Sequence, residues 1–240
     1  MTMISDNLQA VQARIARACA ACGRLPGEVR LLAVSKSFGT QAVLEAARAG
    51  QRAFGENYIQ EAVEKIAALA GPDAPPLQWH CIGPIQSNKT QLVARHFHWA
   101  QTIDRAKIAQ RLNDQRPQDL APLNVCIQVN ADGGPTKSGV SPEDAVALAL
   151  FVAKLPRLRL RGVMSIPDPQ PDFEAQCAAH RRVREVFDAI AARLPSGHGE
   201  FDTLSLGMTA DLEAAIHAGS TMVRVGSGIF GARQYAAPAP

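Results

Sequence analysis

The chain has 240 residues, 47% of them hydrophobic, and a formal net charge of +3. This length suits one large α/β domain, so we expect a single domain over residues 1–240. The charge comes from scattered arginines without a basic run, which argues against nucleic-acid binding. No secretory signal is apparent, and the most apolar stretch, 145–153, is shorter than the roughly 20 residues of a membrane span. We therefore expect a cytoplasmic protein with reduced cysteines.

Helical and strand patterns alternate along the chain. An amphipathic helix comes first, with Ile4, Leu8, Val11, Ile15 and Ala18 on its apolar face. Strands are expected over 29–35, 52–54, 78–82, 99–103, 125–129, 159–164, 203–206 and 222–225. Helices are expected over 41–49, 58–69, 88–96 and 106–114. Three more helices are expected: one that begins after Ser141 as its N-cap, one that includes Phe173 to Ile190, and one that includes Asp211 to Ala215. A loop is expected at 72–76.

Eight strands alternating with helices predict an α/β protein with a parallel (β/α)₈ barrel, the TIM barrel. An open doubly wound sheet is the alternative, but it usually carries G-x-G-x-x-G after strand one, where this chain has Lys36-Ser37-Phe38-Gly39-Thr40. In a barrel, chemistry occurs at the C-terminal strand ends, and Lys36 lies at one of them. An amine in such an apolar setting loses its proton more readily and can attack a carbonyl. A solvated lysine just past a strand is the simpler alternative.

The segments after the last two strands have the residues of an anion site. Ser205-Leu206-Gly207-Met208-Thr209 follows strand seven, and we expect Thr209 to cap the next helix. Gly226-Ser227-Gly228-Ile229-Phe230-Gly231 follows strand eight, where small residues let backbone amides approach a phosphate. Ordinary glycine turns are the alternative at each segment. Arg224 alternates with Val223 and Val225, so its side chain lies on the opposite face of the strand from theirs. There it could pair with a carboxylate in the core or donate hydrogen bonds to a ligand.

Other motifs carry weaker signals. Cys19 and Cys22 form a C-x-x-C without a preceding strand, and His96 and His98 alternate with aromatic residues, so we expect no metal site. The segment 133–139 resembles a nucleotide-binding phosphate loop but has Thr before its Lys where the motif requires Gly. Asn57 and Ser165 are polar residues at the predicted barrel mouth, and each could simply cap a helix or turn.

Over essentially its whole length the chain resembles the pyridoxal phosphate homeostasis proteins. The matching stretches are 31–36, 54–58, 79–89, 137–139, 161–164 and 204–230. The resemblance implies a barrel like the N-terminal domain of alanine racemase, the type III fold of pyridoxal phosphate proteins. It implies that pyridoxal 5′-phosphate is held as a Schiff base on Lys36, with Arg224 facing the pyridine nitrogen and Asn57 near the ring. The implied phosphate contacts are Ser205, Thr209, Gly226 and Ser227.

The chain departs from the family pattern at three places. Ser37-Phe38 stands where Thr-Lys is frequent, Thr209-Ala210 stands where Ser-Asp or Ser-Asn is common, and Gly228 replaces a usual alanine. Thr209 keeps a hydroxyl for the phosphate, whereas Ala210 removes a cap partner.

The same features favour a binding and exchange protein without catalytic turnover. An arginine stays protonated, so it leaves the ring nitrogen unprotonated and weakens the ring as an electron sink. A racemase needs a second acid-base group beside Lys36, and the only tyrosines are Tyr58 and Tyr235, the latter in a tail (235–240) that we expect to be disordered. An amino-acid racemase and a lysine-dependent aldolase on a phosphorylated sugar remain the alternatives. We expect a monomer, with pyridoxal phosphate-dependent apoenzymes as candidate recipients.

Overall fold

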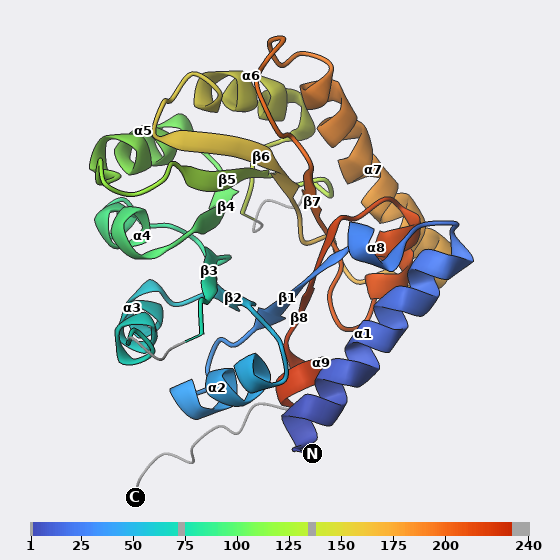
Figure 1. Cartoon of the computed structure of the whole chain (residues 1–240). Helices are drawn as coiled ribbons and strands as arrows, with labels where there is room; N and C mark the ends of the chain where they lie inside the picture. The colour runs from blue at the N-terminus through green and yellow to red at the C-terminus, as the bar shows by residue number, and fades with distance from the viewer. Residues whose placement is uncertain (1, 72–74, 134–137, 232–240) are drawn as a thin grey trace, which may run out of the picture.

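The computed structural model describes residues 2–71, 75–133 and 138–231 and forms a closed barrel whose parallel strands pair in chain order (Figure 1). The strands are β1 (Arg30–Val34), β2 (Ala53–Glu56), β3 (Gln78–Cys81), β4 (Trp99–Ile103), β5 (Leu123–Gln128), β6 (Leu158–Met164), β7 (Thr203–Ser205) and β8 (Met222–Val225). Pairing of β8 with β1 closes the barrel, with Leu32 beside Arg224. The predicted (β/α)₈ barrel is therefore confirmed.

Helices surround the strands, as the connections between parallel neighbours require (Figure 1). They are α1 (Met3–Ala21), α2 (Thr40–Arg48), α3 (Ile59–Ala68), α4 (Thr90–His96), α5 (Ala106–Gln115), α6 (Pro142–Val152), α7 (Phe173–Ala191), α8 (Leu212–His217) and α9 (Ser227–Phe230), with a short 3₁₀ turn η1 (Pro26–Glu28) before β1. The first helix packs across α8 and α9. Ser141 caps α6 as predicted, by accepting a hydrogen bond from the Asp144 amide.

One prediction about the last helices was wrong. Thr209 does not cap the helix after β7, because α8 begins only at Leu212 with Asp211 as its N-cap residue. The small residues after β8 include a short helix, α9. The predicted tail at 235–240, most of the predicted loop at 72–76 and Lys137 of the phosphate-loop-like segment lie outside the described residues.

The hydrophobic core has an outer layer and an inner layer. The outer layer packs the helices against the strands and contains most of the buried apolar residues. Inside the barrel, Leu32, Val34, Ile82 and Met222 form one cluster and Trp99, Cys126 and Met164 another. Polar residues also lie inside the barrel, and they support the site described below.

Several motifs from the sequence have structural roles away from the barrel mouth. Cys19 is fully buried on α1, and Cys22 at the helix end donates to the Ala18 carbonyl. His98 accepts the Trp79 amide through Nδ1. No helix among the described residues has both the length and the apolar character needed to cross a membrane.

Candidate functional site

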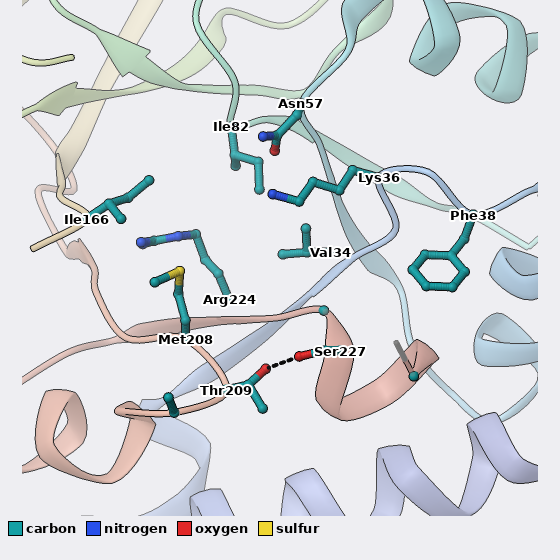
Figure 2. Close-up of a pocket in the computed structure, with 13 residues that line it drawn as sticks. Val34, Lys36, Phe38, Asn57, Ile82, Ile166, Met208, Thr209, Arg224 and Ser227 are labelled. Atoms are coloured by element: carbon teal, nitrogen blue, oxygen red, sulfur yellow. Dashed lines mark hydrogen bonds between the residues drawn. The ribbon is translucent and has the colours of Figure 1, made fainter. Parts of the chain in front are cut away.

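A pocket of about 440 Å³ opens at the C-terminal ends of the strands. Figure 2 shows Lys36 and Asn57 on one side, Thr209 and Ser227 on the other, and Arg224 between them. The lining residues are Val34, Lys36, Phe38, Asn57, Ile82, Ile166, Met208, Thr209, Ala210, Arg224, Gly226, Ser227 and Gly231. The structure thus brings together every residue predicted for the site except Ser205.

Lys36 reaches the pocket because of the alternation along β1. Leu32 and Val34 face the barrel interior, so Lys36 continues the same side just beyond the strand. It lies within a turn in which the Phe38 amide donates to the Ser35 carbonyl at 3.1 Å. Ser37, the third residue of this turn, has φ 67°. The Phe38 ring stacks on Phe230 of α9 at 5.1 Å, which joins the lysine turn to the segment after β8.

Thr209 and Ser227 form the hydroxyl side of the pocket. The Ser227 hydroxyl donates to Thr209 Oγ1 at 3.4 Å, a long bond that leaves both groups able to turn toward a ligand. The absence of a side chain matters at Gly226 and Gly228. A Cβ at Gly226 would lie 3.3 Å from the Val34 carbonyl oxygen, and one at Gly228 would lie 2.9 Å from a Val225 methyl. This packing lets the backbone after β8 lie close to β1 and Thr209.

Two side chains, Arg14 and Asp211, hold the Thr209 segment in place, and neither was found from the sequence. Arg14 of α1 donates to the Thr209 carbonyl at 3.0 Å while it pairs with Glu213 at 2.8 Å. Asp211 accepts the Met208 amide at 2.7 Å and contacts His180 Nε2 at 3.0 Å. Burial alone would raise the pKa of Asp211, but the hydrogen bonds from His180 and the Met208 amide outweigh it and lower that pKa. The negative charge of Asp211 thus fixes the loop before α8.

Arg224 is buried beneath the pocket and points inward, as its alternation predicted. It donates to the Ser205 carbonyl at 2.6 Å, the Ser205 hydroxyl at 2.9 Å and the Ser165 carbonyl at 2.8 Å. Burial lowers the pKa of Arg224 to about 10, an effect that the charge of Asp211 opposes. The guanidinium therefore stays positive near neutrality, and its hydrogen bonds go to neutral oxygens rather than to the core carboxylate that was one alternative.

The structure corrects the expectation that Ser205 contacts phosphate. Its side chain is fully buried inside the barrel, where the hydroxyl accepts from Arg224 and donates to Gln101 Oε1 at 2.7 Å. Ser205 is thus a support for Arg224. The strand β7 ends at this residue, and the segment that follows it lines the pocket from Met208 to Ala210.

A chain of hydrogen bonds continues from Ser205 through the barrel. Gln101 Nε2 lies 2.9 Å from His80 Nδ1, and His80 Nε2 lies 3.1 Å from Gln78 Oε1. Burial, reinforced by the charges of His98 and Arg30, lowers the pKa of His80 well below its usual value. A neutral His80 that accepts at Nδ1 and donates at Nε2 fits both contacts. The support of Arg224 is therefore uncharged.

Asn57 lies at the pocket edge beside Lys36 (Figure 2). Its backbone packs closely against Gly83, where a Cβ would lie 2.2 Å from the Asn57 carbonyl oxygen. The Gly83 carbonyl in turn accepts the Thr102 hydroxyl at 2.7 Å. Ser165, the other polar residue predicted at the mouth, donates its hydroxyl to the Val129 carbonyl at 2.7 Å, and its carbonyl accepts from Arg224.

Comparison with known proteins agrees with this geometry. The alanine racemase N-terminal domain family matches residues 7–234. The pyridoxal phosphate homeostasis protein of Pseudomonas aeruginosa is 54% identical over 239 residues, which cover 100% of both chains. The chain belongs to the pyridoxal phosphate homeostasis protein family. This is the family that the sequence motifs suggested.

Solved structures extend the comparison. PipY of Synechococcus elongatus PCC7942, determined with PLP bound, is 32% identical, with a TM-score of 0.81 over 95% of this chain and 100% of PipY. Alanine racemase from Corynebacterium glutamicum is 17% identical with a TM-score of 0.66, and 98% of this chain covers 61% of that enzyme. The racemase shares the barrel, and the likeness at this identity concerns the fold alone.

The donor set of the pocket fits pyridoxal phosphate. Lys36 offers an amine for an aldehyde, Thr209 and Ser227 offer hydroxyls for a phosphate, and Arg224 offers N–H donors between them. Among the described lining residues, Lys36 is the only one whose side chain carries an amine. The pocket therefore has one group that can attach an aldehyde and separate groups that can bind a phosphate and a ring nitrogen.

Proposed function

We propose that the protein binds pyridoxal 5′-phosphate reversibly and exchanges it, as part of the intracellular homeostasis of this cofactor, without catalytic turnover. The observation that carries the proposal is the placement of Lys36, Arg224, Thr209 and Ser227 around one pocket. It is supported by the family and by a relative, PipY, that was solved with PLP bound. When bound to an amine, this cofactor can withdraw electrons from the attached carbon.

Each residue has a separate binding role in this proposal. Lys36 would attach the aldehyde covalently, while Thr209, Ser227 and the backbone at Gly226 would hold the phosphate. Arg224 would donate to the pyridine nitrogen, and Asn57 would contact the ring. Because the support of Arg224 is neutral, its charge would keep the ring nitrogen unprotonated and would reduce electron withdrawal by the ring.

The second candidate, an amino-acid racemase, would require an acid and a base on opposite sides of the substrate carbon. The described lining residues supply Lys36 for one side but neither a tyrosine nor a carboxylate for the other. Tyr58 lines no part of this pocket, and its side chain is exposed. The carrier is therefore the better supported function.

Two assays on one preparation separate the candidates. The cofactor-loaded protein is first incubated with L-alanine in deuterium oxide, and incorporation at the α-carbon is followed by NMR. A carrier gives the background rate of free cofactor, whereas a racemase exchanges the α-proton far faster. The same loaded protein is then mixed with an apoenzyme that depends on pyridoxal phosphate. Activation of the apoenzyme supports exchange, and retention of all the cofactor would contradict it.

We further propose that the protein acts as a monomer in the cytoplasm, with pyridoxal phosphate-dependent apoenzymes as recipients and without a metal ion. The five cysteines form no disulfide, which fits a reducing compartment. Sedimentation with and without cofactor tests the monomer, since a dimer would double the measured mass.

A further inference from the structure

A second lysine, Lys65, lies directly behind the turn that carries Lys36. It comes from α3 and is only 4% exposed, and it lies on the buried side of that helix with Ile59 and Ala62. Its ammonium group contacts Glu56 Oε1 at 2.7 Å, the Ser35 carbonyl at 3.1 Å and Glu61 Oε1 at 3.3 Å. An ammonium group has three N–H donors, so these three acceptors use all of them.

The contacts of Lys65 extend to both sides of Lys36. The Ser35 hydroxyl donates to Glu56 Oε1 at 2.6 Å, which fixes the residue before Lys36 through its side chain as well as its carbonyl. The Ser37 amide donates to Glu61 Oε1 at 3.2 Å, which fixes the residue after Lys36. Glu56, Glu61 and Lys65 thus form a charged clamp around the lysine turn.

The turn needs such support because of its backbone. Ser37 has φ 67°, the left-handed region that disfavours any residue other than glycine. A residue in this region keeps its conformation only when surrounding contacts impose it. The Ser35 carbonyl accepts the Phe38 amide that closes the turn, and the Ser37 amide belongs to the strained residue within it. The clamp binds both the Ser35 carbonyl and the Ser37 amide.

We propose that Lys65 is a positioning residue for Lys36: together with Glu56 and Glu61 it holds the lysine turn in the one conformation that presents the amine to the aldehyde of the bound cofactor. This inference rests on the proposed function and adds residues outside the pocket to it. In the step concerned, the neutral amine of Lys36 adds to the aldehyde carbon and a C=N bond forms. The aldehyde oxygen leaves as water with both amine hydrogens.

The inference predicts a split between covalent attachment and non-covalent binding. The clamp does not contact the hydroxyls of Thr209 or Ser227, so loss of the clamp leaves the phosphate side intact. Misplacement of a reacting group by about 1 Å can cost about a hundredfold in reaction rate. We expect Lys65→Met to lower the rate and the extent of attachment by about tenfold or more. Glu61→Ala, which removes only the Ser37 contact and part of the Lys65 contact, should lower them less.

The test compares these variants with Glu64→Ala, a matched control. Glu64 lies on the same helix with an exposed side chain and is one residue from Lys65, so the control removes the same charge as Glu61→Ala without touching the turn. Attachment is measured by borohydride reduction and peptide mapping of Lys36. Non-covalent binding is measured with pyridoxine 5′-phosphate, which has an alcohol in place of the aldehyde.

We expect reduced attachment in Lys65→Met and Glu61→Ala, while the affinity of these two variants for pyridoxine 5′-phosphate stays unchanged. In Glu64→Ala neither the attachment nor the affinity should change. Equal losses of attachment and pyridoxine 5′-phosphate binding would show a merely structural role and overturn the inference, as would full attachment in both variants. If Lys65→Met does not fold, Glu61→Ala decides, because its side chain is 39% exposed and its loss is compatible with folding. Absence of attachment in the unmodified protein would instead overturn the proposed function.

Discussion

Replacement of Thr209 by valine tests whether the hydroxyl side of the pocket binds phosphate. Valine keeps the shape of threonine and the backbone carbonyl that Arg14 holds, so the variant removes one hydroxyl and little else. Among the described residues Thr209 Oγ1 accepts one long contact, from Ser227 at 3.4 Å, so turning the hydroxyl toward a phosphate costs little. A hydrogen bond to a charged group contributes about 1.5–3 kcal/mol. The affinity for pyridoxal 5′-phosphate should therefore fall about 10- to 150-fold.

The assay is a fluorescence titration of Thr209→Val and of the unmodified protein with two ligands. Pyridoxal 5′-phosphate should show the predicted loss, whereas pyridoxal, which lacks the phosphate, should bind both proteins equally. Ser227→Ala should behave in the same way, since its hydroxyl faces the same space. Unchanged affinity for pyridoxal 5′-phosphate, or an equal loss for both ligands, would refute the assignment of the phosphate to this side.

Other variants test the supports of the site. Gly83→Ala should displace Asn57 and lower the free energy of unfolding, measured by urea denaturation, by about 1–3 kcal/mol, because the new Cβ would meet a backbone oxygen. Gly27→Ala is the control, since there is open space around Gly27, and equal stabilities of the two variants would contradict the reasoning. Arg224→Gln should lower the free energy of unfolding by about 1–3 kcal/mol, because one buried carbonyl loses its donor. A more stable variant would show that the cost of burying the guanidinium outweighs its hydrogen bonds. The lowered pKa of Asp211 stabilises the fold above the unfolded value of about 3.9, and this contribution is lost as the pH falls through the lower folded value. Asp211→Asn should thus flatten the loss of stability below about pH 4, and an unchanged acid limb would argue against the role of its charge.

The barrel could be predicted from the sequence because the signals were local and repeated. Strand and helix patterns alternate through the whole chain, and the placement of Lys36 followed from the end of an apolar strand. The inward direction of Arg224 followed from strict alternation with two valines. The small residues after β8 also lie at the pocket as predicted.

The errors and omissions arose where distant segments meet. Thr209 matched the residue preference of an N-cap, but its carbonyl is held by Arg14 of α1 and the helix starts later at Leu212. Ser205 matched a strand-end hydroxyl, but its strand ends inside the barrel, where Gln101 is its partner. No local pattern reveals such partners, which lie far away in the chain.

Lys65 illustrates the same limit for charged residues. Its spacing from Glu61 is that of an ordinary surface pair on a helix, a pattern that favours exposure. Only the packing of α3 against the ends of β1 and β2 places its ammonium group under the Ser35 carbonyl. The signal that could have suggested it was Glu56, a carboxylate at a buried strand end that requires a partner.

The central claim is that Lys36 holds the aldehyde of pyridoxal phosphate covalently and reversibly. The most direct measurement is mass spectrometry of the protein after incubation with isotopically labelled cofactor and reduction with borohydride. In a parallel sample, excess unlabelled cofactor is added as a chase before the reduction. We expect one pyridoxyl adduct on the peptide containing Lys36, loss of the label in the chase, and no adduct in Lys36→Ala, which still binds the cofactor weakly. An adduct that persists in Lys36→Ala, or none in the unmodified protein, would contradict it.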